Sequence, residues 1–371
     1  MEELETVGKK PTHRESVTRW KAIVAKHEQP DCGRASWQLL NTVGTYAALW
    51  YFMYLSLSVS WWLTASLTIL AGGVLVRIFI IFHDCCHRSF FKSRLANNVW
   101  GFFTGLLTFT PYYHWRWEHS IHHASAGHLD RRGVGDVWTL TVNEYIESPR
   151  RRRFFYRLVR NPFFLFGIAP LFFFLIGQRI PARNANPRET RSVWVMNFAI
   201  IAMSGGLIAI FGVVPWLVIQ ISVLAVAGSC GVWLFYVQHQ FEDAYWERGE
   251  DWDYTAAALQ GSSFYKLPRI LQWFSGNIGY HHIHHLSPGI PNYNLERCHH
   301  SDPMFQEVKP MLFFESLKSI RFRLWDEEDR KLVGFGHLSK QRRKKARMRK
   351  SARSSRRGST TEDQPHSVAG R

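Results

Sequence analysis

Long apolar blocks alternate with strongly polar stretches along this chain, and the lengths of the blocks predict membrane-spanning helices. A helix needs roughly 20 mainly apolar residues to cross a bilayer. The block at residues 37–82 has room for two spans with a break at "SVSWW", and residues 193–214 and 215–237 form a second pair divided by little more than Pro215. The pattern predicts four spans arranged as two helical hairpins.

Two shorter apolar stretches are not expected to add a crossing. Residues 99–109 are too few to span the bilayer, whereas residues 161–176 are preceded by "RRRFFYRLVR" and followed by "QRIPARNANPRETR". Because basic residues favour the cytoplasmic side, both ends of the second stretch are expected there. We therefore expect it to dip into the membrane or to lie along the surface.

Histidines gather in three clusters that lie outside the predicted spans. They are "HDCCH" at residues 83–87, "HSIHH" at residues 119–123 and "HHIHH" at residues 281–285. With four spans all three clusters face the cytoplasm, whereas an odd number would separate them across the bilayer. The predicted fold class is thus an all-α integral membrane protein with a histidine-rich cytoplasmic cap.

The spacing within these clusters favours metal binding. Residues three or four apart share one face of a helix, so the first and last histidines of each cluster can point into one volume. Adjacent residues such as His122 and His123 point about 100° apart, which suits two neighbouring metal ions better than one. Imidazole binds iron, zinc, copper or nickel, so the spacing alone does not name the metal.

Ligating histidines usually donate their second N–H to a carboxylate, a carbonyl or water. The candidate carboxylates near the clusters are Asp84, Glu118, Asp130, Asp136 and Asp243. The remaining histidines of the polar regions are expected to be ordinary surface or core residues, and these are His114, His128, His299, His300 and His337. Arg77 lies inside the second apolar block and is expected to extend toward lipid headgroups.

Composition adds a charged tail to this scheme. The formal net charge is +17, and residues 340–358 read "KQRRKKARMRKSARSSRRG". Such a run is expected to be disordered, either as a solvated tail or as a tail attracted to anionic lipid. The sequence shows no folded nucleic-acid recognition element beside it, so nucleic acid is not expected as a partner. The five cysteines show no CxxC spacing, so no disulfide framework is expected.

Together with their flanks, the clusters read "HDCCHRSFF", "WRWEHSIHHASAGHLD" and "GNIGYHHIHHLSP". They resemble the HxxxH, HxxHH and HxxHH boxes of the membrane-bound fatty-acid desaturases. The flanks are similar to those of bacterial acyl-lipid desaturases, including Bacillus-type Δ5 enzymes, and more distantly of the Δ12 and ω-3 enzymes. The resemblance covers about residues 31–315. It divides the chain into a cytoplasmic segment at 1–36, a desaturase domain at 37–325 and a basic tail at 326–371.

The resemblance implies a di-iron site. The implied ligands are His83, His87, His119, His122, His123, His239, His281, His284 and His285. Of these, His239 stands in "YVQHQFED" at the cytoplasmic end of the fourth predicted span, and the resemblance implies it because the family carries a histidine ahead of the third box. His282 lies off the HxxHH pattern and is expected to support the site or the fold.

The expected activity is an O2-dependent desaturation that inserts a cis double bond into a long acyl chain esterified in a membrane lipid. The chain has no cytochrome b5 HPGG motif, no GxGxxG pattern and no iron–sulfur cysteine set, so electrons must come from a separate donor of the ferredoxin, flavodoxin or cytochrome b5 type. An acidic donor is expected to dock near Arg150 to Arg153. The expected location is the bacterial cytoplasmic membrane, with the active site on the cytoplasmic face.

Two other functions are compatible with the sequence. A membrane hydroxylase or carotenoid ketolase uses related histidine boxes to insert oxygen, and the products would distinguish it from a desaturase. A metal transporter or storage protein would instead carry polar residues along its spans, but those of this chain are almost wholly apolar apart from Arg77 and small hydroxyl residues.

Overall fold

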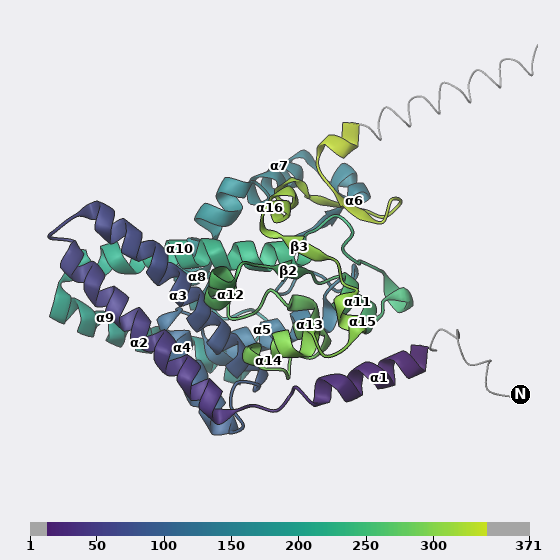
Figure 1. Ribbon diagram of the computed structural model, residues 1–371. Helices are drawn as coiled ribbons and strands as arrows, with labels where there is room; N and C mark the ends of the chain where they lie inside the picture. The colour runs from purple at the N-terminus through teal and green to yellow at the C-terminus, as the bar shows by residue number, and fades with distance from the viewer. Residues whose placement is uncertain (1–12, 340–371) are drawn as a thin grey trace, which may run out of the picture.

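The computed structural model describes residues 13–339, and helices dominate it (Figure 1). The helices of 25 residues or more extend to one side of the molecule and most of the short elements gather at the other, which we name the cap. The helices of more than ten residues are α1 (His13–Ala25), α2 (Cys32–Ser56), α3 (Trp61–His87), α4 (Arg94–Leu107), α5 (Tyr112–Ser125), α9 (Pro187–Phe211) and α10 (Val213–His239).

The first predicted hairpin is formed by α2 and α3. Asp31 caps the start of α2 by accepting a hydrogen bond from the backbone N–H of Arg34 at 2.9 Å. The chain turns between Ser56 and Trp61, where the sequence predicted the break. Helix α3 does not end with the apolar block at residue 82 but continues to His87. The first histidine cluster is therefore rigidly attached to a long apolar helix.

The second predicted hairpin is formed by α9 and α10, and its turn lies two to three residues earlier than expected. The break is at Gly212, whose φ of 90° is a conformation that glycine adopts readily. Pro215 lies in the first turn of α10, where a missing N–H removes no helical hydrogen bond. Helix α10 ends at His239, so it carries a histidine to the cap in the same way as α3.

Among residues 13–339, three helices are long and apolar enough to cross a membrane, namely α3, α9 and α10. A fourth crossing is possible if α7 (Arg150–Val159) and the segment Phe164–Arg179, which meet at an angle of 59°, form one broken span. That segment comprises η1 (Phe164–Ile168), α8 (Ala169–Leu175) and η2 (Gly177–Arg179). The class of all-α membrane protein is confirmed; the number of four spans stays a prediction, because α2 is long enough but falls short in apolarity.

The cap is assembled from short helices and two small sheets. Its short helices are α6 (Val142–Glu147), η3 (Gly249–Asp251), α11 (Tyr254–Gln260), α12 (Arg269–Phe274), α13 (His281–Leu286), α14 (Asn292–His299), α15 (Pro303–Gln306), α16 (Phe313–Ser316) and η4 (Leu317–Arg321). One sheet pairs β4 (Leu324–Asp326) with β1 (Leu140–Thr141) in parallel and with β5 (Lys331–Val333) in antiparallel orientation. In the other, β2 (Phe264–Lys266) runs parallel to β3 (Pro310–Leu312). The sequence did not predict these strands, since each is only two or three residues long.

Two of the predicted segment boundaries differ from the structure. The boundary at 36/37 falls inside α2, and the boundary at 326 falls at the end of β4. The following strand packs Leu332 and Val333 into the interior, so the folded part of the chain extends at least to residue 339. The basic run at 340–358, for which disorder was expected, lies outside the described residues. All five cysteines are free thiols.

Candidate metal centre

The three histidine clusters and His239 come together where four helices meet at the cap. Helix α3 brings the first cluster, α5 the second, the end of α10 brings His239, and α13 brings the third cluster. All nine histidines implied by the boxes contact at least one other member of the set. Segments separated by more than 100 residues thus converge on one volume.

Five of these histidines form the first group. Its members are His83, His87, His119, His123 and His284. Each contributes one ring nitrogen, and these five nitrogens all lie within 4.8 Å of one another. His123 is central, because its Nε2 lies 3.0 Å from Nε2 of His119 and 3.0 Å from Nε2 of His284.

The other four histidines form the second group. His122, His239 and His285 place ring nitrogens within 4.8 Å of one another. Nε2 of His239 lies 3.2 Å from that of His122 and 2.9 Å from that of His281, which connects the fourth member. The ring centroids of His123 and His285 are 4.2 Å apart, so the two groups are in direct contact.

Sequence neighbours separate between the two groups. On α5, His123 belongs to the first group and His122 to the second; on α13, His284 belongs to the first and His285 to the second. This is the arrangement expected when adjacent helical residues point about 100° apart. The prediction that adjacent histidines point into two neighbouring volumes agrees with this geometry.

The donor set is suited to metal ions. Burial holds the pKa values of five of these histidines well below the usual range, and they are His119, His123, His281, His284 and His285. Their imidazoles are therefore neutral and able to bind metal. Two nitrogens bound to one metal at about 2.1 Å lie roughly 3.0–3.4 Å apart, which matches the Nε2 separations. The buried Nε2 atoms of His87 and His285 have no hydrogen-bond partner, and a metal would satisfy them.

Two of the five candidate carboxylates contact these histidines. Oδ1 of Asp136 lies 2.6 Å from Nδ1 of His122, and Oδ1 of Asp84 lies 3.1 Å from Nδ1 of His83. The other oxygen of Asp84 accepts the backbone N–H of Asn292 at 2.6 Å and its side-chain amide at 2.8 Å. Each carboxylate leaves the Nε2 of its histidine directed at the group, which is the usual support of a metal-binding imidazole. Sequence reasoning missed Asn292, for which no motif gave a signal.

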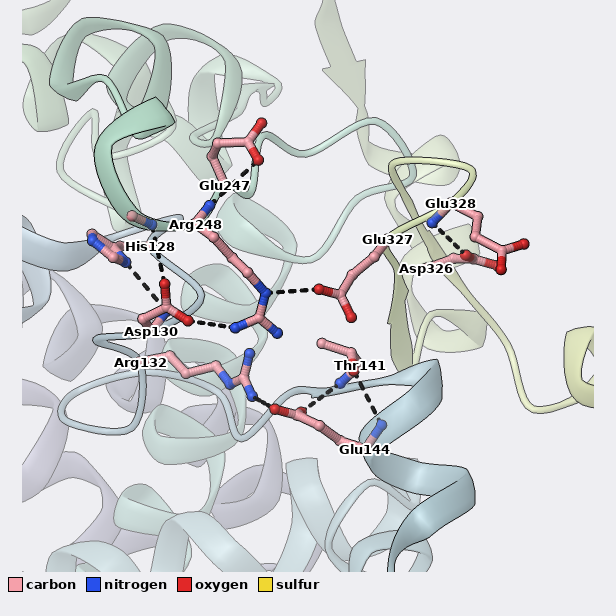
Figure 2. Close-up of polar contacts among 11 residues, drawn as sticks. His128, Asp130, Arg132, Thr141, Glu144, Glu247, Arg248, Asp326, Glu327 and Glu328 are labelled. Atoms are coloured by element: carbon pink, nitrogen blue, oxygen red, sulfur yellow. Dashed lines mark hydrogen bonds and ion pairs between the residues drawn. The ribbon is translucent and has the colours of Figure 1, made fainter.

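The other three carboxylates do not contact the nine histidines. Glu118 is 3.7 Å from His114, and Asp243 is exposed. Asp130 forms an ion pair with Arg248, which also pairs with Glu327 at 2.8 Å (Figure 2). These three expectations are wrong, because nearness in sequence does not fix which way a side chain points. Arg248 therefore joins its own loop to the loop of Asp130 and to the turn after β4.

The histidines expected to be ordinary all lie outside both groups. Nε2 of His282 lies 3.1 Å from Nδ1 of His299, and burial lowers the pKa of these residues to about 3 and about 4 respectively, so the pair stays neutral. His300 is exposed, and His337 lies 2.7 Å from Asp326. His128 is buried, and its Nδ1 accepts the backbone N–H of Asp130.

Arg77 does not extend toward lipid as the sequence suggested. Its Nε donates to the hydroxyl of Thr42 at 3.2 Å, its Nη1 donates to the carbonyl of Trp273, and the guanidinium lies 4.4 Å from the centre of the Trp273 ring. The side chain therefore joins α2, α3 and α12 within the protein.

An apolar helical bundle whose ends hold nine converging histidines defines a membrane protein with a polyhistidine metal centre. The chain belongs to the fatty acid desaturase family, whose model matches residues 60–314, a range that includes all nine histidines. The resemblance seen in the sequence is confirmed, and the protein is an oxidoreductase that desaturates fatty acids.

Curated relatives support the same assignment. The chain is 50% identical over 312 residues to "Fatty acid desaturase" of Bacillus subtilis (strain 168), covering 84% of this chain and 89% of that protein. Two proteins of Synechocystis sp. are more distant. The "sn-1 oleoyl-lipid 12-desaturase" is 28% identical over 69% of this chain and 71% of its own length. The "sn-1 acyl-lipid omega-3 desaturase (ferredoxin)" is 27% identical over 68% of this chain and 69% of its own length.

Proposed function

We propose that this protein is an acyl-lipid desaturase that uses O2 and two iron ions to insert a cis double bond into a long acyl chain. The observation that carries the proposal is the division of nine histidines into two contacting groups. His83, His87, His119, His123 and His284 would hold one iron, and His122, His239, His281 and His285 the other. When bound, the metal pair supplies the oxygen activation that protein side chains lack.

The chain's own residues prepare this site in three ways. Hydrogen bonds from Nδ1 of His83 to Asp84 and of His122 to Asp136 orient both rings. The backbone carbonyl of Gly261 lies 3.3 Å from Nδ1 of His239 and orients the third ring in the same way. Burial of the histidines excludes water, which protects reactive chemistry from side reactions.

The substrate is a membrane lipid acyl chain, as the names of the Synechocystis relatives indicate for those proteins. We infer that the tail approaches from the bilayer and that the metal centre lies on the cytoplasmic side of a bacterial membrane. Support comes from α3 and α10, which each pass from an apolar stretch directly into the centre. The apolar helices and the cap that follows them support a reactive site at the membrane surface.

Expression in a host with saturated membrane lipids tests the function. We expect new monounsaturated acyl chains in the membrane lipids, and mass spectrometry of derivatised fatty acids would locate the double bond. Iron should copurify with the protein. Hydroxylated chains would favour the membrane hydroxylase instead, and unchanged lipids with altered cellular metal content would favour transport or storage.

We also propose an acidic electron donor of the ferredoxin or flavodoxin type, with a cytochrome b5 type donor as the alternative. A relative whose name includes ferredoxin supports this, as do the exposed residues Arg150, Arg151 and Arg152 on α7. Because attraction between opposite charges is screened by salt, the rate of reduction by ferredoxin should fall as ionic strength rises. Replacing these arginines with glutamine should lower both the rate and its salt dependence, measured by stopped-flow spectroscopy. A rate unaffected by salt would contradict this docking mode.

A further inference from the structure

Arg160, which follows the last residue of α7, is one of the largest fully buried side chains in the described part of the molecule. Its Nη2 donates to Gln240 Oε1 at 2.7 Å, to the carbonyl of Phe322 at 3.1 Å and to the hydroxyl of Tyr236 at 3.4 Å. Its Nε and Nη1 are buried without any acceptor. A guanidinium is always charged and has five N–H donors, so this group lacks both a counter-charge and most of its hydrogen bonds.

A second buried arginine meets the same acceptors. Nη1 of Arg323 donates to the carbonyl of Phe322 at 3.0 Å and to the hydroxyl of Tyr236 at 3.4 Å. Within residues 13–339, neither Arg160 nor Arg323 forms an ion pair with a carboxylate, whereas Arg132, Arg248 and other arginines do. The Arg160 guanidinium also lies 5.2 Å from the centre of the Tyr236 ring, but a neutral ring supplies no counter-charge. Burying like charges together without a counter-charge is strongly unfavourable, which makes the pair a candidate site for an anion.

The elements on both sides of this pair have the composition of a membrane interface. Helix α7 exposes Phe154 and Phe155 beside its arginines. On the other side, α16 and η4 expose Phe314 and Leu317 together with Lys318. The hydroxyl of Tyr156 on α7 donates to the carbonyl of Arg323, just after η4, and the hydroxyl of Tyr236 on α10 donates to the carbonyl of Ser319 within η4 at 3.1 Å. Exposed aromatic and basic side chains together are typical of the headgroup region of a bilayer.

The pair is also linked to the metal centre. Gln240, which accepts a hydrogen bond from Arg160, directly follows His239 in the chain. It contacts Thr139 through its Nε2 at 3.2 Å and lines a cavity shared with His122, His239 and Asp136. A ligand held by the two arginines would therefore lie beside the cavity that adjoins the second histidine group.

We propose that Arg160 and Arg323 bind the phosphate of a glycerophospholipid and thereby hold the acyl-lipid substrate by its polar end next to the metal centre. That the bound lipid is the substrate rests on the proposed function, whereas the existence of the anion site does not depend on that function. Guanidinium groups bind phosphate through charge-assisted hydrogen bonds, and these would use the N–H groups of Arg160 that have no acceptor. A free phosphate ion offers the same chemistry, so the experiment includes both sources.

Native mass spectrometry of the iron-loaded protein in neutral detergent tests the proposal. The ligands are dipalmitoyl phosphatidylglycerol, dipalmitoylglycerol and inorganic phosphate. The wild-type protein should bind the phospholipid at least about tenfold more tightly than the phosphate-free lipid. Arg160→Gln and Arg323→Gln should each remove most of this difference, whereas Arg160→Lys should keep part of it. Arg269→Gln removes an exposed arginine elsewhere in the cap and should change nothing.

Three results would overturn the proposal. The first is that the wild-type protein binds the two lipids with equal affinity. The second is that the glutamine variants lose the same amount of affinity for both lipids. The third is that micromolar inorganic phosphate displaces the phospholipid. If Arg160→Gln does not fold, Arg323→Gln and Arg160→Lys give the same comparison. Because binding needs neither O2 nor electrons, a protein that selects the phospholipid but forms no double bond contradicts the proposed function alone. An active enzyme without phosphate selectivity contradicts the anion site alone.

Discussion

The variant His123→Ala should lose its metal and its desaturase activity together. Nε2 of His123 lies 3.0 Å from the corresponding atoms of both His119 and His284, and its ring stacks on His285 at 4.2 Å. Removing it takes away a donor from the middle of the first group and a contact between the two groups. Since supporting residues around a metal already contribute 10–100-fold to affinity or activity, we expect activity to fall by more than about 100-fold. Iron content of the purified protein should fall with it.

An exposed histidine of the same cap provides the control. His300 lies outside both groups, so His300→Ala should retain iron and activity at wild-type levels. Thermal unfolding in detergent separates the loss of metal from a failure to fold: the His123→Ala protein should unfold near the temperature of wild-type protein that has been stripped of metal by a chelator. Full iron content in active His123→Ala protein would contradict the proposed ligand set.

The variant Asp136→Asn should hold metal about 10–100-fold more weakly than the wild type. Nδ1–H of His122 donates to Oδ1 of Asp136 at 2.6 Å, and this charge-assisted bond fixes the ring with Nε2 directed at the second group. The neutral amide accepts a weaker hydrogen bond and can also present its N–H₂ to the ring, which favours the wrong tautomer. The measurement is the rate at which a chelator removes iron, with desaturation followed in parallel.

Asp130→Asn is the matched control for this prediction. Asp130 is a carboxylate of the same loop, but it pairs with Arg248 and accepts the backbone N–H of Gly249 at 3.0 Å instead of contacting one of the nine histidines (Figure 2). Its replacement should leave iron retention close to that of the wild type and lower thermal stability only slightly, because exposed ion pairs contribute about 0–1 kcal/mol. Equal iron loss from both variants would show that Asp136 has no specific role.

The positions of the hairpins and of the histidine clusters were predictable from the sequence because each depends on local patterns. Apolar blocks of sufficient length predicted the α2–α3 and α9–α10 pairs, and the helix boundaries moved by only a few residues. The angle between adjacent helical residues already indicated that His122 and His123 point into different volumes. Family motifs then identified His239, which no spacing rule places near the other histidines.

The tertiary structure alone decided which residues meet. His122 contacts His239 across 117 positions, and Asp84 contacts Asn292 across 208, so no local pattern distinguishes these partners from other residues. The same applies to the choice of Asp84 and Asp136 over Asp130, and to the burial of Arg160 beside Arg323. Local sequence determines which faces of a helix are apolar, but the direction of a loop side chain depends on the packing of distant segments against it.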